Sequence, residues 1–403
     1  MHHITGRYST AVVYTDIIEE TAAAQIQTLC DQPFVENCRI RIMPDVHAGS
    51  GCVIGFTADL GELVIPSIVG VDIGCGMLTV ELGNTPVDFE QLDQIIRQFV
   101  PSGMNTHETP AAEFPQLEEL LCRNQLKNTD RIRGSIGTLG GGNHFIEVDA
   151  DEAGNHYLVI HTGSRNLGKQ VAEHYQQLAW DTLCGSICAQ TRRDALIREY
   201  REQGRTAQLQ QALQELRDQA PRIPRELCYL TGADRDAYLH DMAICQQYAV
   251  ENRRTIADLI LTHLLGKTLD DFPHFETIHN YIDRESNIIR KGAVSAQLGE
   301  RLLIPINMRD GSLICTGKGN PEWNCSAPHG AGRLFSRGVA RRKFTVESFA
   351  KEMDGIYTTS VSQETLDECP MAYKPMESIV ENIAPTAEIV SIIRPLYNFK
   401  AGE

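Results

Sequence analysis

Hydrophobic residues recur along the chain with two different periods, which predict where strands and helices lie. Within residues 39–82, Leu78, Val80 and Leu82 alternate with polar residues. A period of two is typical of a strand with one buried face. From 167 to 265 apolar residues recur instead at intervals of three and four, and this spacing predicts amphipathic helices.

The order of these patterns indicates a single domain. Strands are expected within 39–82, at 145–148, at 157–160 and within 288–316, a glycine-punctuated stretch at 317–332, and helices at 167–265 and beyond 345. No internal repeat or low-complexity linker interrupts the sequence. We therefore predict one α+β domain over residues 1–403, with a helical insertion at 167–265.

Composition narrows the class of protein. No stretch approaches the ~20 apolar residues of a membrane helix, and the twelve cysteines include no CxxC pair. These features predict a cytoplasmic protein without a membrane partner or a disulfide framework. The net charge of −16 argues mildly against a nucleic-acid partner, although five cations lie within residues 333–343.

Several ionisable residues lie among glycines, where loops can present side chains to a cleft. Taken singly, such residues are more often turn-capping or core residues than ligands. Together they offer oxygen, sulfur and nitrogen donors, which suit a first-row divalent ion, and a thiolate can bridge two ions. The ligand types alone favour zinc, whereas the presence of a carboxylate also makes manganese a candidate metal. These residues are Asp72, Cys75, His144, His161, His279 and His329.

A further polar motif is Met43-Pro44-Asp45-Val46-His47. Asp45 and His47 form either a carboxylate–histidine pair that contacts the ligands of a site or part of a simple turn.

Seven motifs, in order, resemble the RtcB family of RNA ligases. They are MPDVHAGSG, VGVDIGCGM, GTLGGGNHFIEV, IHTGSRNLG, HNY, RKGAVSA and SAPHGAGR. The resemblance runs from about residue 40 to 345 and continues more loosely through 371–374. It implies an RtcB-like mixed β-sheet core surrounded by helices.

The resemblance also implies a role for each matching residue. Asp72, Cys75, His144, His161 and His279 would bind two Mn²⁺ ions, with Cys75 as the bridge, and His329 would take GMP from GTP. The implied nucleotide-binding residues are Asn143, Glu147, Asn280, Asn307, Ser312, Arg333 and Lys400. The residues implied to contact RNA or phosphate, or to support the ligands, are Asp45, His47, Arg165 and Lys291.

The implied reaction joins an RNA 3′-phosphate or 2′,3′-cyclic phosphate to a 5′-hydroxyl through a GMP–histidine intermediate, in tRNA splicing or RNA repair. Two positions depart from the family pattern. Ser50 replaces a lysine, and Pro305-Ile306-Asn307-Met308 replaces a Pro-Gly-Ser-Met turn. These departures leave two alternatives open: a metal-dependent phosphodiesterase or phosphatase that acts on RNA ends without ligation, and a non-catalytic protein that binds RNA ends. The sequence does not indicate an activator protein.

Overall fold

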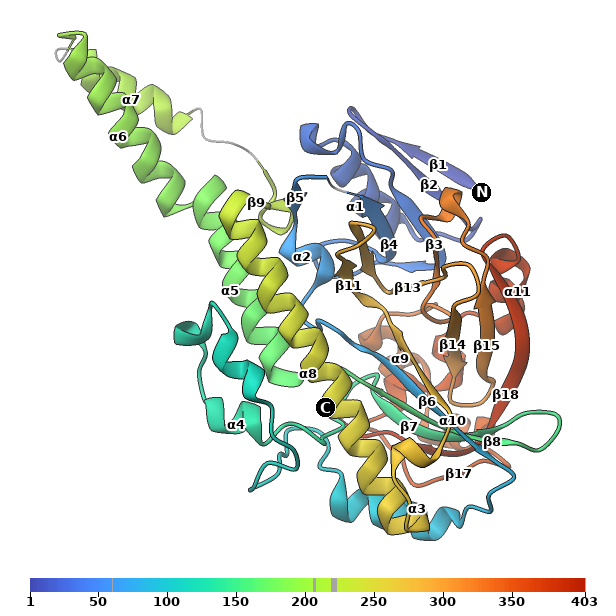
Figure 1. Ribbon diagram of the computed structural model, residues 1–403. Helices are drawn as coiled ribbons and strands as arrows, with labels where there is room; N and C mark the ends of the chain where they lie inside the picture. The colour runs from blue at the N-terminus through green and yellow to red at the C-terminus, as the bar shows by residue number, and fades with distance from the viewer. Residues whose placement is uncertain (60, 206–207, 219–222, 403) are drawn as a thin grey trace.

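The chain folds as two main β-sheets with helices packed around them (Figure 1). This computed structural model describes residues 1–59, 61–205, 208–218 and 223–402. Helices and strands alternate irregularly along the chain, and the sheets are mixed or antiparallel. The predicted α+β class is confirmed.

The element bounds follow the predicted order in most of the chain. The strands are β1 (His2–Thr5), β2 (Thr10–Val13), β3 (Arg41–His47), β4 (Ile54–Asp59), β5 (Leu63–Val64), β6 (Gly76–Gly83), β7 (Phe145–Ala150), β8 (His156–Thr162), β9 (Leu230–Thr231), β10 (His274–Ile278), β11 (Asn280–Asp283), β12 (Ile288–Lys291), β13 (Ala293–Ser295), β14 (Arg301–Asn307), β15 (Gly311–Gly317), β16 (Ser326–Pro328), β17 (Tyr357–Thr358) and β18 (Ala387–Phe399). The α-helices are α1 (Glu20–Cys30), α2 (Pro66–Val69), α3 (Phe89–Phe99), α4 (Thr129–Arg133), α5 (Arg165–Leu183), α6 (Ser186–Glu202), α7 (Leu209–Asp218), α8 (Gly232–Leu265), α9 (Arg337–Lys343), α10 (Val346–Glu352) and α11 (Met376–Ile383).

The larger sheet carries most of the candidate site. Its strand order is β10-β6-β8-β7-β18-β15-β14, with β17 beside β18. Leu78, Val80 and Ile160 lie on one face of the sheet and pack against α3 and α8 through residues such as Ile256 and Ile260. This burial explains the period of two in β6. The opposite face contributes Glu147 to the main cavity of the described chain.

The smaller sheet has the order β1-β2-β3-β4-β12-β11. Its central strands are buried, and β3 carries Asp45 at a fully buried position. Because β11 follows His279 and β12 ends at Lys291, this sheet borders the same region as β10. The two sheets therefore enclose the candidate site from two sides.

The strand β18 corrects the expectation that only helices follow residue 345. It spans 13 residues and pairs with β7 on one side and β15 on the other. Pro395 argues against a central strand, because proline cannot donate a ladder hydrogen bond. The register shift between Pro395 and Tyr397 accommodates the proline.

The helical region 167–265 divides into two parts in the fold. In Figure 1, α6 and α7 extend away from the body, whereas α8 lies along the larger sheet. The helices agree with the predicted spacing. That this region is an insertion within a single domain stays a prediction.

Within the described ranges, no helix has the length and apolar composition needed to span a bilayer. All twelve cysteines, each in the described part of the chain, are free thiols.

Candidate metal and nucleotide site

At one side of the larger sheet two strands begin and two strands end, and each of these four termini carries a candidate ligand. The Asp72–Cys75 loop leads into β6, His144 immediately precedes β7, His161 lies at the end of β8, and His279 follows β10. These strands are antiparallel neighbours. Starts and ends of successive antiparallel strands meet at the same edge, so the ligands converge although up to 207 residues separate them.

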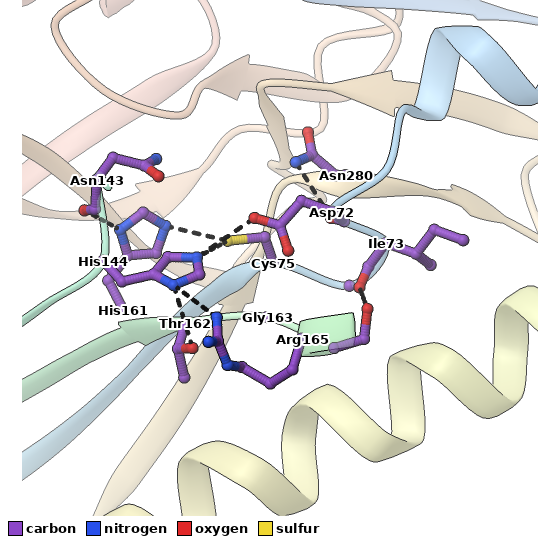
Figure 2. Close-up of polar contacts among 12 residues, drawn as sticks. Asp72, Ile73, Cys75, Asn143, His144, His161, Thr162, Gly163, Arg165 and Asn280 are labelled. Atoms are coloured by element: carbon purple, nitrogen blue, oxygen red, sulfur yellow. Dashed lines mark hydrogen bonds and ion pairs between the residues drawn. The ribbon is translucent and has the colours of Figure 1, made fainter. Parts of the chain in front are cut away.

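The side chains of these loops meet at the Cys75 thiol (Figure 2). Its Sγ lies 3.3 Å from His161 Nε2 and 3.6 Å from His144 Nε2. His161 Nε2 lies 3.1 Å from His279 Nε2, and His144 Nε2 lies 3.3 Å from Asp72 Oδ2. The donors form two groups, Cys75–His161–His279 and Asp72–Cys75–His144, which share only the sulfur. Two ions bridged by one thiolate would use such a donor set.

Backbone carbonyls orient two of the imidazole rings. His144 Nδ1 donates to the Leu139 carbonyl at 2.9 Å, and His161 Nδ1 donates to the Asn143 carbonyl at 3.2 Å. A carbonyl can only accept, so we assign the proton of each neutral ring to Nδ1. Each Nε2 then directs a lone pair at the cluster, as metal-binding histidines do.

Burial keeps two of the histidine ligands, His161 and His279, neutral. It lowers the pKa of His161 well below its ordinary value and that of His279 to about 3, with neighbouring histidines adding to both shifts. Burial, followed by the nearby Asp72 carboxylate, raises the pKa of the Cys75 thiol well above its ordinary value. Neutral imidazole lone pairs and a carboxylate oxygen facing one another repel unless a cation lies among them. The donor set therefore fits a divalent metal ion.

His329 lies beside this cluster but is held by a different partner. Its ring centroid is 4.9 Å from that of His279. Its Nδ1 lies 2.6 Å from Asp45 Oδ2, and its backbone N–H donates to the same oxygen at 3.1 Å. The Asp45 side chain is fully buried, whereas 19% of the His329 side chain is exposed. An Nδ1–H bonded to a carboxylate leaves Nε2 free to act as a nucleophile.

A cavity of about 750 Å³ opens over the cluster and His329. Eleven sequence-predicted site residues line it: His47, Asp72, Asn143, Glu147, His161, His279, Asn280, Asn307, His329, Arg333 and Lys400. Burial raises the pKa of Glu147 to about 7 and lowers that of His47 to about 4. The cavity thus brings together metal-ligand side chains, His329 and several hydrogen-bonding groups.

The remaining predicted residues lie behind the cavity wall. Cys75 and His144 are buried in the cluster, and Asp45 is buried behind His329. Arg165 Nε donates to Thr138 Oγ1 at 3.3 Å. Its Nη1 lies 3.4 Å from His144 Nδ1 (Figure 2). The last two, Lys291 and Ser312, are also buried: the Lys291 ammonium donates to the carbonyls of Ser50 and Ser67, and Ser312 lies in β15.

Glu368, which the sequence did not indicate, organises the cations of the cavity. Its carboxylate lies 3.1 Å from Arg333 Nη1, 3.2 Å from Arg337 Nη2 and 2.9 Å from Lys400 Nζ. The Tyr373 hydroxyl donates to it at 2.5 Å. Burial acts to raise the pKa of Glu368, but the three cations outweigh burial and hold the pKa well below its ordinary value. No feature of the sequence could distinguish this glutamate from a solvated one.

We expect Glu368→Gln to lower the free energy of unfolding by about 3 kcal/mol, because it removes the carboxylate that pairs with the buried Lys400 ammonium. The folded-state pKa of Glu368 is depressed, so its stabilisation is complete above the unfolded value of about 4.3 and is lost as pH falls below it. Urea unfolding at pH 7 and at pH 3.5 should therefore show a smaller difference between variant and wild type at pH 3.5. Glu352→Gln removes the partly exposed partner of Arg309 and should cost less than about 1 kcal/mol. An equal loss of unfolding free energy in the two variants would contradict a stabilising role for the buried Glu368 carboxylate.

Comparison with known proteins identifies relatives of this chain. The sequence pattern of the family described as tRNA-splicing ligase RtcB matches residues 25–124 and 121–401. The RNA-splicing ligase RtcB of Escherichia coli strain K12 is 30% identical over 415 residues, covering 94% of this chain and 93% of that protein. The tRNA-splicing ligase RtcB of Archaeoglobus fulgidus is 26% identical over 472 residues, covering 94% and 91%.

These matches span nearly the whole chain, including every loop that contributes a cluster ligand. They confirm the resemblance drawn from the motifs. The chain therefore belongs to the RtcB family and is an RNA ligase.

Proposed function

We propose that this protein joins RNA ends bearing a 3′-phosphate or 2′,3′-cyclic phosphate to 5′-hydroxyl ends, with GTP and two Mn²⁺ ions as cofactors, in tRNA splicing or RNA repair. The observation that carries the proposal is His329, which is bonded to Asp45 through Nδ1 and lies beside the metal-type cluster in the main cavity. A protein that only binds RNA ends does not need a histidine whose Nδ1 is bonded to a carboxylate and whose Nε2 is available as a nucleophile.

In the first step, His329 Nε2 attacks the α-phosphorus of GTP. The N–P bond forms, the P–O bond to the β-phosphate breaks, and pyrophosphate leaves. The Nδ1 proton stays on the ring, and the Asp45 carboxylate stabilises the positive charge that the ring acquires. Arg333, Arg337 and Lys400 lie on one wall of the cavity and are suited to hold the anionic phosphates.

In the second step, an oxygen of the RNA 3′-phosphate attacks the same phosphorus, the N–P bond breaks, and GMP passes to the RNA end. In the third step, the 5′-hydroxyl oxygen of the other RNA attacks the RNA phosphorus and releases its proton to solvent. The P–O bond to the attached GMP breaks, the phosphodiester forms, and GMP leaves. A cyclic phosphate must first be opened by water to leave a 3′-phosphate. Glu147, buried at the cavity wall, is the proposed partner of the guanine edge.

Asp72, Cys75, His144, His161 and His279 would hold the ions. Divalent metal ions neutralise charge on reacting phosphates and orient the leaving group.

The test is to incubate RNA carrying a cyclic phosphate and RNA carrying a 5′-hydroxyl with Mn²⁺, in the presence and absence of GTP. Ligation that requires GTP supports the proposal. Opened or dephosphorylated ends without ligation would favour the phosphodiesterase or phosphatase. An absence of both reactions, together with RNA binding, would favour the non-catalytic binding protein.

The departure at Ser50 leads to a separate prediction about RNA affinity. Ser50 is exposed, and the loop that contains it borders the cavity at Ala48 and Gly49. A lysine at position 50 adds a cation beside this opening. We expect Ser50→Lys to lower the KM for RNA and to steepen the salt dependence of RNA binding by about one phosphate contact.

Binding is measured by fluorescence anisotropy across a range of salt concentrations. The control is Gln91→Lys, which adds the same charge at an exposed position on α3, across the larger sheet from the cavity. Equal slopes for Ser50→Lys and wild type would mean that position 50 does not face the RNA.

A further inference from the structure

Two adjacent polar residues of α8, Asn252 and Arg253, lie beneath the metal-type cluster. Both side chains are completely buried. A buried amide and a buried guanidinium are costly to a fold unless their hydrogen bonds are made inside the protein. The partners of both residues belong to the loops that carry the cluster ligands and to the adjoining strands β8 and β10.

Asn252 joins two of these loops. Its Oδ1 accepts hydrogen bonds from the backbone N–H groups of Gly137 at 2.8 Å and Thr138 at 3.0 Å. Its Nδ2 donates to the Thr138 carbonyl at 3.1 Å and to the Gly163 carbonyl at 3.2 Å. One amide thus connects the loop that leads into His144 with the turn that follows β8.

Arg253 joins the remaining loops. Its Nη1 donates to the Gly74 carbonyl at 3.0 Å and to the Thr162 carbonyl at 2.8 Å. Gly74 precedes Cys75 directly, and Thr162 is the last residue of β8. The Nε of Arg253 donates to Glu276 at 2.7 Å, in the strand that leads to His279.

These anchors matter because the ligand loops are rich in glycine. Gly74, Gly137, Gly140 and Gly142 all have positive φ values, between 73° and 84°. Glycine carries the largest conformational freedom of any residue, and fixing it costs the most entropy. At Gly74 a Cβ would come within 2.9 Å of the α8 backbone, so the loop lies directly against this helix. The position of α8 therefore determines the position of the loop.

We propose that Asn252 and Arg253 are positioning residues that fix the spacing of the metal ligands. They contact neither the reacting groups nor the cavity. Their hydrogen bonds hold the loops of Asp72, Cys75, His144 and His161, and the strand before His279, in one arrangement before an ion binds. This inference rests on the metal site in the proposed function. Partners behind metal ligands commonly change metal affinity by about 10- to 100-fold when they are replaced.

Two variants test the role while limiting the damage to folding. Asn252→Asp keeps the size and the acceptor for the two N–H groups, but turns an oxygen toward the Thr138 and Gly163 carbonyls. Arg253→Met combined with Glu276→Gln removes both charges of the ion pair, so that neither remains uncompensated. The matched control is Arg254→Met, because Arg254 is the next residue of α8 and pairs with the exposed Asp270.

The measurements are the Kd for Mn²⁺, from titration calorimetry, and the absorption spectrum of the protein saturated with Co²⁺. A thiolate bound to Co²⁺ gives a charge-transfer band that reports the geometry at Cys75, which a loss of global stability alone would not alter. We expect a 10- to 100-fold weaker Mn²⁺ Kd and a shifted or weakened band in both variants, with wild-type values in Arg254→Met.

Wild-type Mn²⁺ affinity and a wild-type Co²⁺ spectrum in either folded variant would overturn the role of that residue. If the Arg253 double variant does not fold, Asn252→Asp decides the proposal by itself. A wild-type protein that binds neither ion contradicts the proposed metal site and, with it, this inference.

Discussion

Incubation with GTP and Mn²⁺ should add one GMP to the wild-type protein and none to His329→Ala. The expectation follows from the geometry of the ring, whose Nδ1 is bonded to Asp45 while Nε2 remains available at the cavity. Loss of a nucleophile can cost up to about 10⁶-fold in rate. We therefore expect His329→Ala to join 3′-phosphate ends at least roughly 10³-fold more slowly than the wild type. The same variant should still seal an RNA end that already carries GMP, because the last step does not use the histidine.

Mass spectrometry of the intact protein measures the adduct, and its chemistry identifies the linkage. A phosphoramidate on histidine is labile to acid and survives alkali. His156→Asn is a matched control, because His156 lies at the opposite end of β8 and bonds the Thr85 carbonyl. Asp45→Asn should slow formation of the adduct by about 10²- to 10⁴-fold, as loss of the orienting carboxylate does in other histidine-dependent sites. An acid-labile GMP adduct that persists in His329→Ala would place the nucleophile elsewhere.

Much of the larger sheet could be predicted because one of its faces is buried. Leu78, Val80 and Leu82 alternate because their face packs against α3 and α8, and the pattern records this burial directly. β18 escaped prediction because Pro395 opposes a central strand, and only the register shift beside it makes the strand possible. The local sequence pattern indicates which residues are buried. It does not indicate a register shift, which depends on the partner strand.

The candidate site shows the same limit. Glycine-flanked ligand types indicated which side chains carry chemistry, yet their convergence depends on the order of antiparallel strands. The bond between Asp45 and His329 joins residues 284 positions apart. The charge on Glu368 is interpretable only once its three cationic partners are known. Asn252 left a clear signal: it falls four and eight residues before Ile256 and Ile260, on the apolar stripe of α8. A polar residue at a core position requires hydrogen-bond partners inside the protein.

Cys75→Ala should abolish binding of both ions at the proposed metal site, because the sulfur is the only donor shared by the two ligand groups. Alanine leaves two donors in each group, His161 and His279 in one and Asp72 and His144 in the other. The fold should survive the loss of one small buried side chain at a cost of about 1 kcal/mol. Manganese content is measured by elemental analysis after dialysis, and folding by urea unfolding. Cys315→Ala removes an equally buried thiol in β15 and should keep its metal and its ligation activity.

The pH dependence of binding separates a ligand role for Cys75 from a packing role. Burial and Asp72 raise the pKa of the free thiol well above its ordinary value, so the metal-free protein carries a proton on sulfur at neutral pH. A metal ion binds the thiolate and must displace that proton. The apparent affinity of the wild type for Mn²⁺ should therefore rise about tenfold for each unit of pH between 6 and 8 from this group alone. His161 and His279 are already neutral in this range and add no further slope. Any residual binding by Cys75→Ala should lack this tenfold component, and equal pH slopes in the two proteins would show that the thiol is not a ligand.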